Sequence, residues 1–157
     1  MNPPAPKRRP RRILAVASGG GHWVQLLRLL PAFEGQRVIF VSVDPAYRLD
    51  VEGHEFHTVT DATRWNKLRL LKMAAEVLLL VLRVRPHVVI STGAAPGYFA
   101  LRFGKLLGAR TVWLDSIANI EQLSLAGQRV RPHADLWLTQ WPHLATPDGP
   151  RYLGAVL

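Results

Sequence analysis

Hydrophobic residues along the chain fall into two kinds of segment, which alternate. Short continuous apolar runs are typical of strands buried on both faces of a parallel sheet, whereas apolar residues spaced three and four positions apart indicate helices. By these criteria we expect strands over residues 13–17, 37–42, 55–60, 87–91, 110–114 and 135–139, and helices over residues 23–32, 66–84 and 98–107. The alternation predicts βαβ units, and hence an α/β fold with a Rossmann-like parallel sheet that carries helices on both faces.

A glycine-rich segment, residues 17–23, joins the first expected strand to the first expected helix. Its sequence is Ala-Ser-Gly-Gly-Gly-His-Trp, and consecutive glycines let the backbone turn sharply while leaving its N–H groups uncovered. N–H groups at the start of a helix favour a bound anion such as a phosphate. The segment matches neither the dinucleotide fingerprint nor the P-loop, and a tight turn without a ligand is the alternative.

Other segments with glycines or small polar residues follow the expected strands in the same way. Ligands of open parallel sheets bind where the strands end and the chain enters the next helix. Here those positions are residues 18–22, 42–44, 91–96 and 115–119, and residues 92–97 are expected to form a second glycine-rich loop. The repetition of this pattern favours a binding site at one edge of the sheet over a set of bare turns.

His22 is the residue of the first glycine-rich segment that carries acid–base chemistry. A histidine there is able to act as a general base or to bind a hydroxyl or phosphate, and the alternative is a residue that only hydrogen-bonds the loop. We expect no metal site at His54, Glu55 and His57, because the zinc-protease spacing is absent and the two histidines would face opposite sides of a strand. No serine lies in a nucleophile elbow, which argues against a hydrolase.

Composition narrows the class of protein further. The length of 157 residues suits one domain, and 48% hydrophobic residues suffice for a substantial core. The chain has no cysteine, which excludes disulfides, thiolate catalysis and zinc–thiolate sites. Residues 1–12, rich in proline and arginine, are expected to be a disordered basic head, and residues 13–157 the folded lobe.

The formal net charge of +9 suits an anionic partner: nucleic acid, anionic lipid or a phosphorylated substrate. Charge alone does not choose among the three. Nucleic acid is not expected, because no RNA- or DNA-binding signature is present and the basic residues are not interleaved with the candidates for stacking on bases, Trp113, Trp137 and Trp141.

The expected helix over residues 66–84 begins with aromatic and basic residues and continues as an apolar stretch. Its apolar run, residues 73–82, is shorter than the roughly 20 residues that a membrane-spanning helix needs, and Glu76 interrupts it. Such a helix suits the surface of an anionic membrane, and the alternative is a core helix whose basic end is solvated. The residues expected to face the membrane are Trp65, Lys67, Arg69 and Lys72.

Three motifs connect this chain with a known family. They are Ser-Gly-Gly-Gly-His at residues 18–22, Ser-Thr-Gly-Ala-Ala-Pro at residues 91–96, and Asp-Leu-Trp-Leu-Thr-Gln-Trp-Pro at residues 135–142. With them the chain resembles the acceptor-side, membrane-anchoring subunit of the split UDP-N-acetylglucosamine transferase of lipid-linked oligosaccharide synthesis, and its bacterial relatives in polysaccharide biosynthesis. One loop departs from the family, which tends to carry Ile-Glu-Ser followed by an arginine where this chain has Leu-Asp-Ser at residues 114–116.

The resemblance implies a single GT-B-type amino-terminal lobe that is active only with a partner chain. The partner, a nucleotide-sugar-binding catalytic glycosyltransferase subunit, would bring the donor, and this chain would recruit it to the membrane. This lobe would hold a polyprenyl-diphosphate-linked sugar acceptor on the cytoplasmic face of the inner membrane, as a peripheral protein. No cofactor and no metal is implied. The rival interpretations are a non-catalytic basic Rossmann-like module that binds nucleotide or nucleic acid, and a purely structural membrane recruiter.

The resemblance and the expected sheet edge together give a set of site residues. His22 is the first candidate for the base that takes the proton of the acceptor hydroxyl, and Asp115 is the second. The residues expected to bind the acceptor or its phosphates are Ser18, Gly19, Gly20, Gly21, Thr92, Gly93, Ala94, Pro96 and Ser116. The residues expected at the partner interface are Gln140, Trp141 and Pro142.

Overall fold

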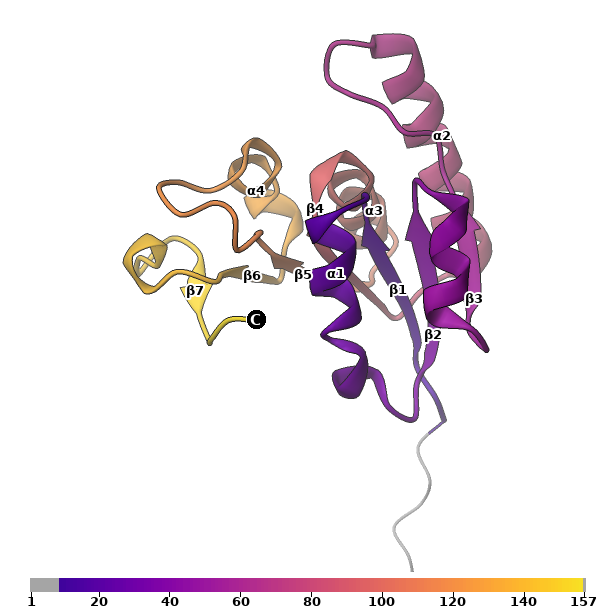
Figure 1. Cartoon of the computed structure of the whole chain (residues 1–157), viewed down its shortest axis with the longest axis horizontal. Coiled ribbons are helices and arrows are strands. Elements are labelled where there is room, and N and C mark those ends of the chain that lie inside the picture. Colours follow the sequence, from indigo (N-terminus) through magenta and orange to yellow (C-terminus); the bar gives the residue numbers. More distant parts are fainter. Residues whose placement is uncertain (1–8, 157) are drawn as a thin grey trace, which may run out of the picture.

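The strands form one seven-stranded sheet in which every neighbouring pair is parallel (Figure 1). The computed structural model describes residues 9–156. The strand order is β3-β2-β1-β4-β5-β6-β7, which confirms the expected α/β, Rossmann-like fold. The strands are β1 (Arg12–Ala17), β2 (Arg37–Ser42), β3 (Glu55–Thr58), β4 (Val88–Gly93), β5 (Arg110–Leu114), β6 (Leu136–Thr139) and β7 (Arg151–Tyr152).

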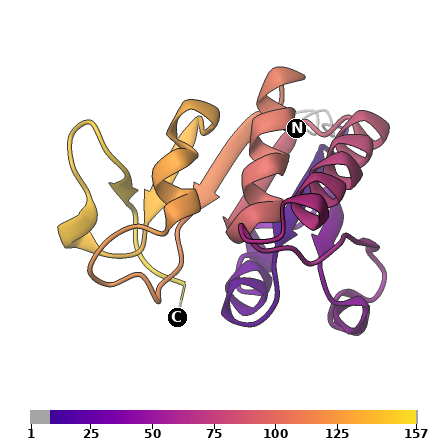
Figure 2. The ribbon, with the colours of Figure 1, turned by 90° about the horizontal axis from the view of Figure 1, so that it is seen from above.

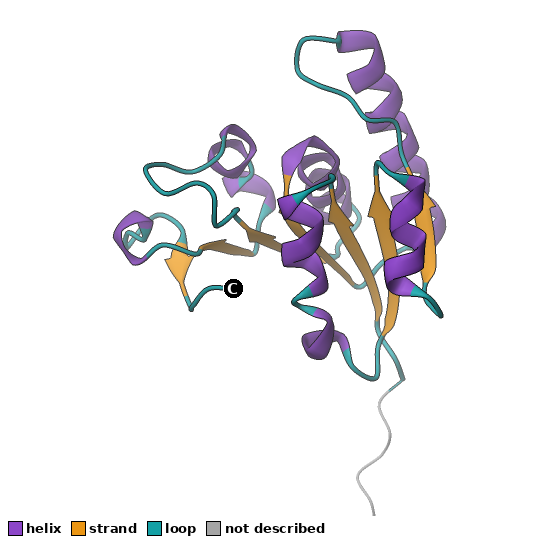
Figure 3. Ribbon diagram, viewed as in Figure 1, coloured by secondary structure: helices purple, strands orange, loops and turns teal. Residues whose placement is uncertain are grey.

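Helices cover both faces of the sheet, as expected (Figures 2 and 3). One face carries α1 (Gly21–Leu27), and the other carries α2 (Lys67–Val84), α3 (Ala94–Leu106) and α4 (Leu125–Arg129). Four short 3-10 helices complete the fold: η1 (Leu30–Phe33), η2 (Pro45–Val51), η3 (Arg131–His133) and η4 (Pro142–Leu144).

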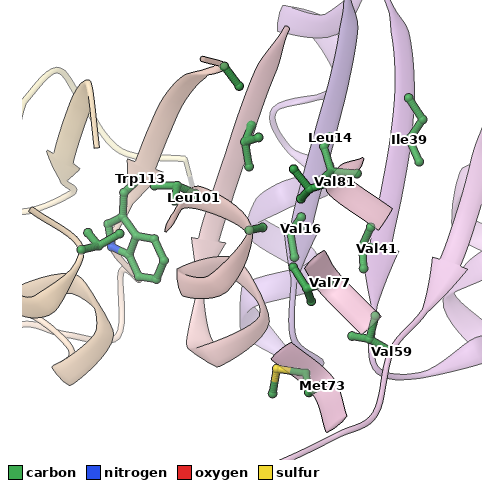
Figure 4. Close-up of a cluster of buried hydrophobic side chains, with 14 residues drawn as sticks. Leu14, Val16, Ile39, Val41, Val59, Met73, Val77, Val81, Leu101 and Trp113 are labelled. Atoms are coloured by element: carbon green, nitrogen blue, oxygen red, sulfur yellow. The ribbon is translucent and has the colours of Figure 1, made fainter. Parts of the chain in front are cut away.

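The side chains of β1, an inner strand of the sheet, alternate between two apolar cores, one on each face of the sheet. Leu14 and Val16 pack on the side of α2 and α3 (Figure 4), whereas Ala15 packs on the side of α1. Because both faces are buried, the apolar run of this strand is continuous rather than alternating. The residues that α2 adds to the core are Met73, Val77 and Val81.

The first helix is shorter than expected. It begins at Gly21 and ends at Leu27, and η1 follows as a separate element from Leu30. Pro31 lies in the first turn of η1, and because proline has no N–H and crowds the preceding turn, it does not continue a helix that began before it. Among the α-helices and strands, α4 and β7 were not expected, because elements of five and two residues are too short to give a periodic pattern.

The second glycine-rich segment, residues 92–97, is not a loop as expected. β4 continues through Gly93 and α3 begins at Ala94, so that Pro96 lies in the first turn of the helix. Proline is tolerated there because the first N–H groups of a helix have no partner within it. The chain passes from strand to helix through the positive φ angles of Gly93 (143°) and Ala94 (67°).

The sheet begins earlier than the expected domain boundary. Residues 1–8 of the basic head lie outside the described residues, but β1 starts at Arg12, whose backbone pairs with Arg37. The Arg12 guanidinium donates hydrogen bonds to the carbonyl oxygens of Val84 at 3.0 Å and Arg85 at 2.8 Å, at the end of α2. The last carbonyls of a helix lack partners within it, so this arginine stabilises α2 and belongs to the folded lobe.

An ion pair between Lys105 and Asp135 ties α3 to the residue before β6. The hydrogen bond from Lys105 is the main cause that holds the pKa of Asp135 below its ordinary value of 3.8; burial opposes it, and bonds from Thr111 add to it. A carboxyl whose pKa is lowered by folding stabilises the protein above its ordinary pKa, and this contribution is lost as the pH falls through the lowered value.

We therefore expect Asp135→Asn to lower the melting temperature at neutral pH. The difference from the wild type is expected to shrink as the pH falls below 3.8, because protonation removes the negative charge from the wild type as well. Thermal melts of both proteins over a series of pH values make the measurement. A difference that stays constant into acid would contradict the ion pair as its cause.

Candidate functional site

His22 lies where two segments meet at the carboxyl edge of the sheet. It is the second residue of α1, and its Nδ1 is 3.0 Å from the carbonyl oxygen of Thr92, near the end of β4. Thr92 Oγ1 donates in return to the carbonyl oxygen of His22 at 2.6 Å. With its proton on Nδ1, the imidazole donates to Thr92 and keeps Nε2 as an acceptor, which is the state that a general base requires.

Gly93 makes room for this histidine. Its φ is 143°, and a Cβ at this position would lie 2.3 Å from His22 Nδ1. Since non-bonded atoms do not approach so closely, any larger residue would displace the imidazole ring. The Gly93 N–H donates to Ser91 Oγ at 3.1 Å, so β4 itself holds the turn. Residues 91–96, the second of the three motifs, therefore form the surface against which the His22 ring packs.

Tyr47 covers the first glycine-rich segment. The Gly20 N–H donates to the Tyr47 hydroxyl at 2.9 Å, and a Cβ on Gly19 would lie 3.1 Å from the same oxygen. The Tyr47 ring stacks on Trp23, with 4.9 Å between the ring centroids. One N–H group that we expected to be free for an anion is thus already paired. Sequence reasoning missed Tyr47, because η2 was recognisable only as a turn.

Asp115 is not placed as a base, which corrects the second of the two expectations. Its side chain is only 1% exposed. The carboxylate accepts four hydrogen bonds, from Trp113 Nε1 at 3.0 Å, Asn119 Nδ2 at 3.1 Å, Ser124 N at 2.9 Å and Ser124 Oγ at 2.6 Å. A buried carboxylate surrounded by donors does not reach an acceptor hydroxyl. Instead, Asp115 holds the loop that follows β5 and the start of α4.

Ser116 and Gln140 lie in a buried polar cluster around Gln25. Gln25 Nε2 donates to Ser116 Oγ at 3.1 Å, and Gln25 Oε1 accepts from Gln140 Nε2. Ser116 is 6% exposed and Gln140 is 2% exposed, so neither offers a surface to an acceptor or to a partner. Both expectations are corrected. The sequence signal for Gln25 was a polar residue among the apolar positions of α1.

The other expected binding residues divide between the edge and the interior. Thr92 and Gly93 are buried beneath His22, and Pro96 is buried within α3, so that none of them offers a side chain to an acceptor. The residues that remain accessible at the edge are Ser18, Gly19, Gly20, Gly21 and Ala94. Of the third motif, Trp141 is half-buried and donates from Nε1 to the Ile117 carbonyl at 2.8 Å, and Pro142 is exposed.

The first turns of α2 project past the strand ends at this same edge (Figure 1). Asn66 caps the helix by accepting a hydrogen bond from the Arg69 N–H at 3.1 Å. Trp65 is 80% exposed, and the Arg64 guanidinium lies 4.5 Å from its ring centroid. The basic residues expected to face a membrane, Lys67, Arg69 and Lys72, are all exposed.

Two kinds of feature are absent from residues 9–156. None of the helices there is long and apolar enough to cross a membrane. The same residues contain no group of three or more histidine, aspartate or glutamate side chains that is placed to hold a metal ion. His57 Nε2 instead pairs with Glu55 at 2.8 Å.

The sheet order and the layers define a Rossmann-like lobe of the GT-B type. MurG of Acinetobacter baumannii superposes with a TM-score of 0.73 at 14% identity, and the match covers 90% of this chain and 45% of the MurG chain. A UDP-N-acetylglucosamine 2-epimerase from Rickettsia bellii gives a TM-score of 0.65 at 10% identity, over 85% of this chain and 39% of that chain. These likenesses concern the fold alone, and they confirm the expected amino-terminal lobe.

The chain belongs to the family described as "Oligosaccharide biosynthesis protein Alg14 like", whose model matches residues 53–156. This confirms the resemblance seen in the motifs. Two relatives are each named UDP-N-acetylglucosamine transferase subunit ALG14. The Yarrowia lipolytica protein is 26% identical over 172 residues, which cover 89% of this chain and 78% of that protein. The Eremothecium gossypii protein is 29% identical over 168 residues, which cover 87% of this chain and 75% of that protein.

Proposed function

We propose that this chain is the acceptor-binding subunit of a two-chain glycosyltransferase in polysaccharide or lipid-linked oligosaccharide synthesis. The observation that carries the proposal is the match over 78% and 75% of the length of two relatives that are named transferase subunits. A nucleotide-sugar-binding partner subunit brings the donor. This lobe presents a sugar on a polyprenyl diphosphate, as a peripheral protein on the cytoplasmic face of the inner membrane.

The chemistry assigned to His22 is the removal of one proton. The acceptor hydroxyl oxygen attacks the anomeric carbon of the donor sugar, the bond from that carbon to the nucleotide diphosphate breaks, and the hydroxyl proton passes to His22 Nε2. The 3.0 Å contact between Nδ1 and the Thr92 carbonyl supports this role, because it fixes both the ring and the free Nε2. Backbone N–H groups of the glycine segment other than that of Gly20 are suited to donate hydrogen bonds to the oxygens of the acceptor sugar.

Reconstitution tests the proposal as a whole. The full chain, a nucleotide-sugar-binding subunit from the same organism and vesicles carrying the lipid-linked acceptor are combined with UDP-N-acetylglucosamine. Transfer is expected only when both chains are present. Equal transfer by the partner alone contradicts the proposal. Binding to DNA with a steep dependence on salt, in place of association with the partner, favours the non-catalytic nucleic-acid-binding module.

Binding of α2 to an anionic membrane is part of the proposal. The helix has a second apolar stripe that faces away from the core, in which Leu68 is 82% exposed, Leu71 is 69% exposed and Leu79 is 66% exposed. Large exposed apolar side chains beside basic residues are typical of helices that lie in the interface of a membrane. The same end of α2 carries Trp65, an aromatic side chain suited to the headgroup level.

Replacing Lys67, Arg69 and Lys72 together by glutamine is expected to weaken binding to phosphatidylglycerol vesicles by about 2–3 kcal/mol, since each basic residue near an anionic surface contributes about 1 kcal/mol. Flotation of the full chain with such vesicles gives the measurement. The matched control replaces Arg37, Arg110 and Arg151 by glutamine, which changes the net charge by the same amount. These three arginines lie on strands. Equal losses in the two variants would show that net charge, and not α2, governs binding.

A further inference from the structure

A cavity of about 310 Å³ opens between the start of α2, the start of α3 and α4. Its volume falls at the lower end of the range of about 300–1,000 Å³ that is usual for small-molecule sites. The lining is mostly apolar and includes Leu70 of α2, Phe99 of α3 and Ala126 of α4. The described 3-10 helices and strands contribute no residue to it, so the cavity belongs to the helical layer on one face of the sheet.

Two arginines complete the lining. Arg64 precedes α2 and Arg129 ends α4, and both are exposed. Among the ion pairs of residues 9–156, neither arginine has a carboxylate partner. Arginine binds phosphate through parallel N–H donors, whereas apolar walls offer nothing to a free phosphate. An apolar cavity with two unpaired arginines therefore suits an amphiphile in which hydrocarbon is joined directly to an anionic group.

The position of the cavity connects the α2 surface with the His22 edge. Ala95 lines it two residues after Gly93, against which His22 is seated. On its other side Arg64 lies over the ring of Trp65, at the start of the exposed apolar stripe of α2. The cavity therefore lies between the exposed apolar stripe of α2 and the strand-to-helix turn against which His22 packs.

One wall of the cavity is fixed by the buried Asp115. Ser124 Oγ accepts from the Gly127 N–H at 2.8 Å, which caps α4, and donates to Asp115 at 2.6 Å. A Cβ on Gly127 would lie 2.3 Å from Asp115 Oδ1, so α4 sits directly on this carboxylate. The cavity is thus a preformed feature of the fold, which reduces the entropy cost of filling it.

We propose that the cavity takes the isoprene units next to the diphosphate of the lipid-linked acceptor, with Arg64 and Arg129 on the diphosphate. The inference rests on the proposed function and adds to it the place where the lipid enters the protein. Burial of hydrocarbon against Leu70, Phe99 and Ala126 supplies affinity that a diphosphate alone lacks.

Isothermal titration of the full chain with farnesyl diphosphate, a short polyprenyl diphosphate, tests the inference. The wild type is expected to bind it about tenfold or more tightly than inorganic diphosphate, because the hydrocarbon adds buried apolar area. Ala126→Phe fills the cavity. It is expected to lower the affinity for farnesyl diphosphate by about tenfold while leaving the affinity for inorganic diphosphate unchanged. Leu125→Gln, at a lining position that is 41% exposed, gives the same loss without a change in the core.

The charge on the cavity is tested separately. Arg129→Gln is expected to lower the affinity for both farnesyl diphosphate and inorganic diphosphate. The matched control Arg110→Gln, at the start of β5, is expected to change neither affinity. Unchanged affinity for farnesyl diphosphate in both Ala126→Phe and Leu125→Gln overturns the inference. The inference is also overturned if dihexanoyl phosphatidylglycerol binds as tightly as farnesyl diphosphate and competes with it, because the cavity would then accept any membrane lipid.

The transfer assay separates failure of the inference from failure of the proposed function. If folded Ala126→Phe transfers sugar with an unchanged KM for the lipid-linked acceptor, the cavity inference fails and the two-chain transferase stands. If the variant loses farnesyl diphosphate while the wild type shows no transfer with any partner, the lipid site stands and the proposed function fails.

Discussion

Replacing His22 by asparagine is expected to lower kcat for sugar transfer by about 10²–10⁴, the usual contribution of a general base. Asparagine keeps an N–H donor for the Thr92 carbonyl, which His22 Nδ1 contacts at 3.0 Å, but it has no basic nitrogen. The fold and the KM for the acceptor are therefore expected to change little. Steady-state transfer by the two-chain complex, with the acceptor concentration varied, gives both constants.

Two further variants show whether the effect is specific. Gly93→Ala keeps the imidazole but places a Cβ 2.3 Å from Nδ1, so it is expected to displace the base and to lose rate as well. His54→Asn, a change of the same kind at an exposed histidine near Phe40, is expected to keep the wild-type rate. A wild-type kcat in His22→Asn would contradict the role of His22 as a base and would show that it only hydrogen-bonds the loop.

Replacing Asp115 by asparagine is expected to cost about 2–4 kcal/mol of the free energy of unfolding, because hydrogen bonds to a charged acceptor are lost and buried donors are left unpaired. One carboxylate oxygen becomes an NH₂ group that faces either Trp113 Nε1 and Ser124 Oγ or Asn119 Nδ2 and the Ser124 N–H. Urea unfolding of both proteins, compared at equal m-values, measures the loss.

The matched control is Asp148→Asn, at an exposed position between η4 and β7, where a change within about 0.5 kcal/mol is expected. The transfer assay then distinguishes the two roles considered for Asp115. The fraction of Asp115→Asn that is folded is expected to transfer sugar. Wild-type stability together with abolished transfer would return Asp115 to the reaction as a base.

The elements long enough to show a full apolar run or a full helical periodicity could be predicted from the sequence. β1 is buried on both faces, so its apolar run is unbroken, and α2 places Met73, Val77 and Val81 at helical spacing. The shortest elements carry no such pattern. The end of β4 differs from the prediction, because glycines usually indicate a loop, whereas here Gly93 and Ala94 turn the chain directly into a helix through positive φ angles.

The position of the candidate site could be predicted from the sequence, but the role of each residue in it could not. His22 could be proposed from its neighbours in the sequence, because the glycines beside it mark the strand end. The partners of Asp115 and Gln140 could not, because burial depends on contacts between distant segments. Gln140 meets Gln25 across 115 positions, and no local pattern indicates that pairing. Polar residues that follow strands therefore include both accessible groups at the candidate site and buried residues that join distant segments by hydrogen bonds.

The reciprocal bonds between His22 and Thr92 also bear on how the protein matures during synthesis. They join residues 70 positions apart, and β4 must already have inserted beside β1 for Thr92 to be present. Such distant pairing is slow, because the entropy of closing the loop is lost before any contact compensates for it. While the ribosome has released only β1, β2 and β3, the imidazole has no carbonyl to orient it. A chain in which β4 has not yet paired with β1 therefore lacks both of the hydrogen bonds that orient His22.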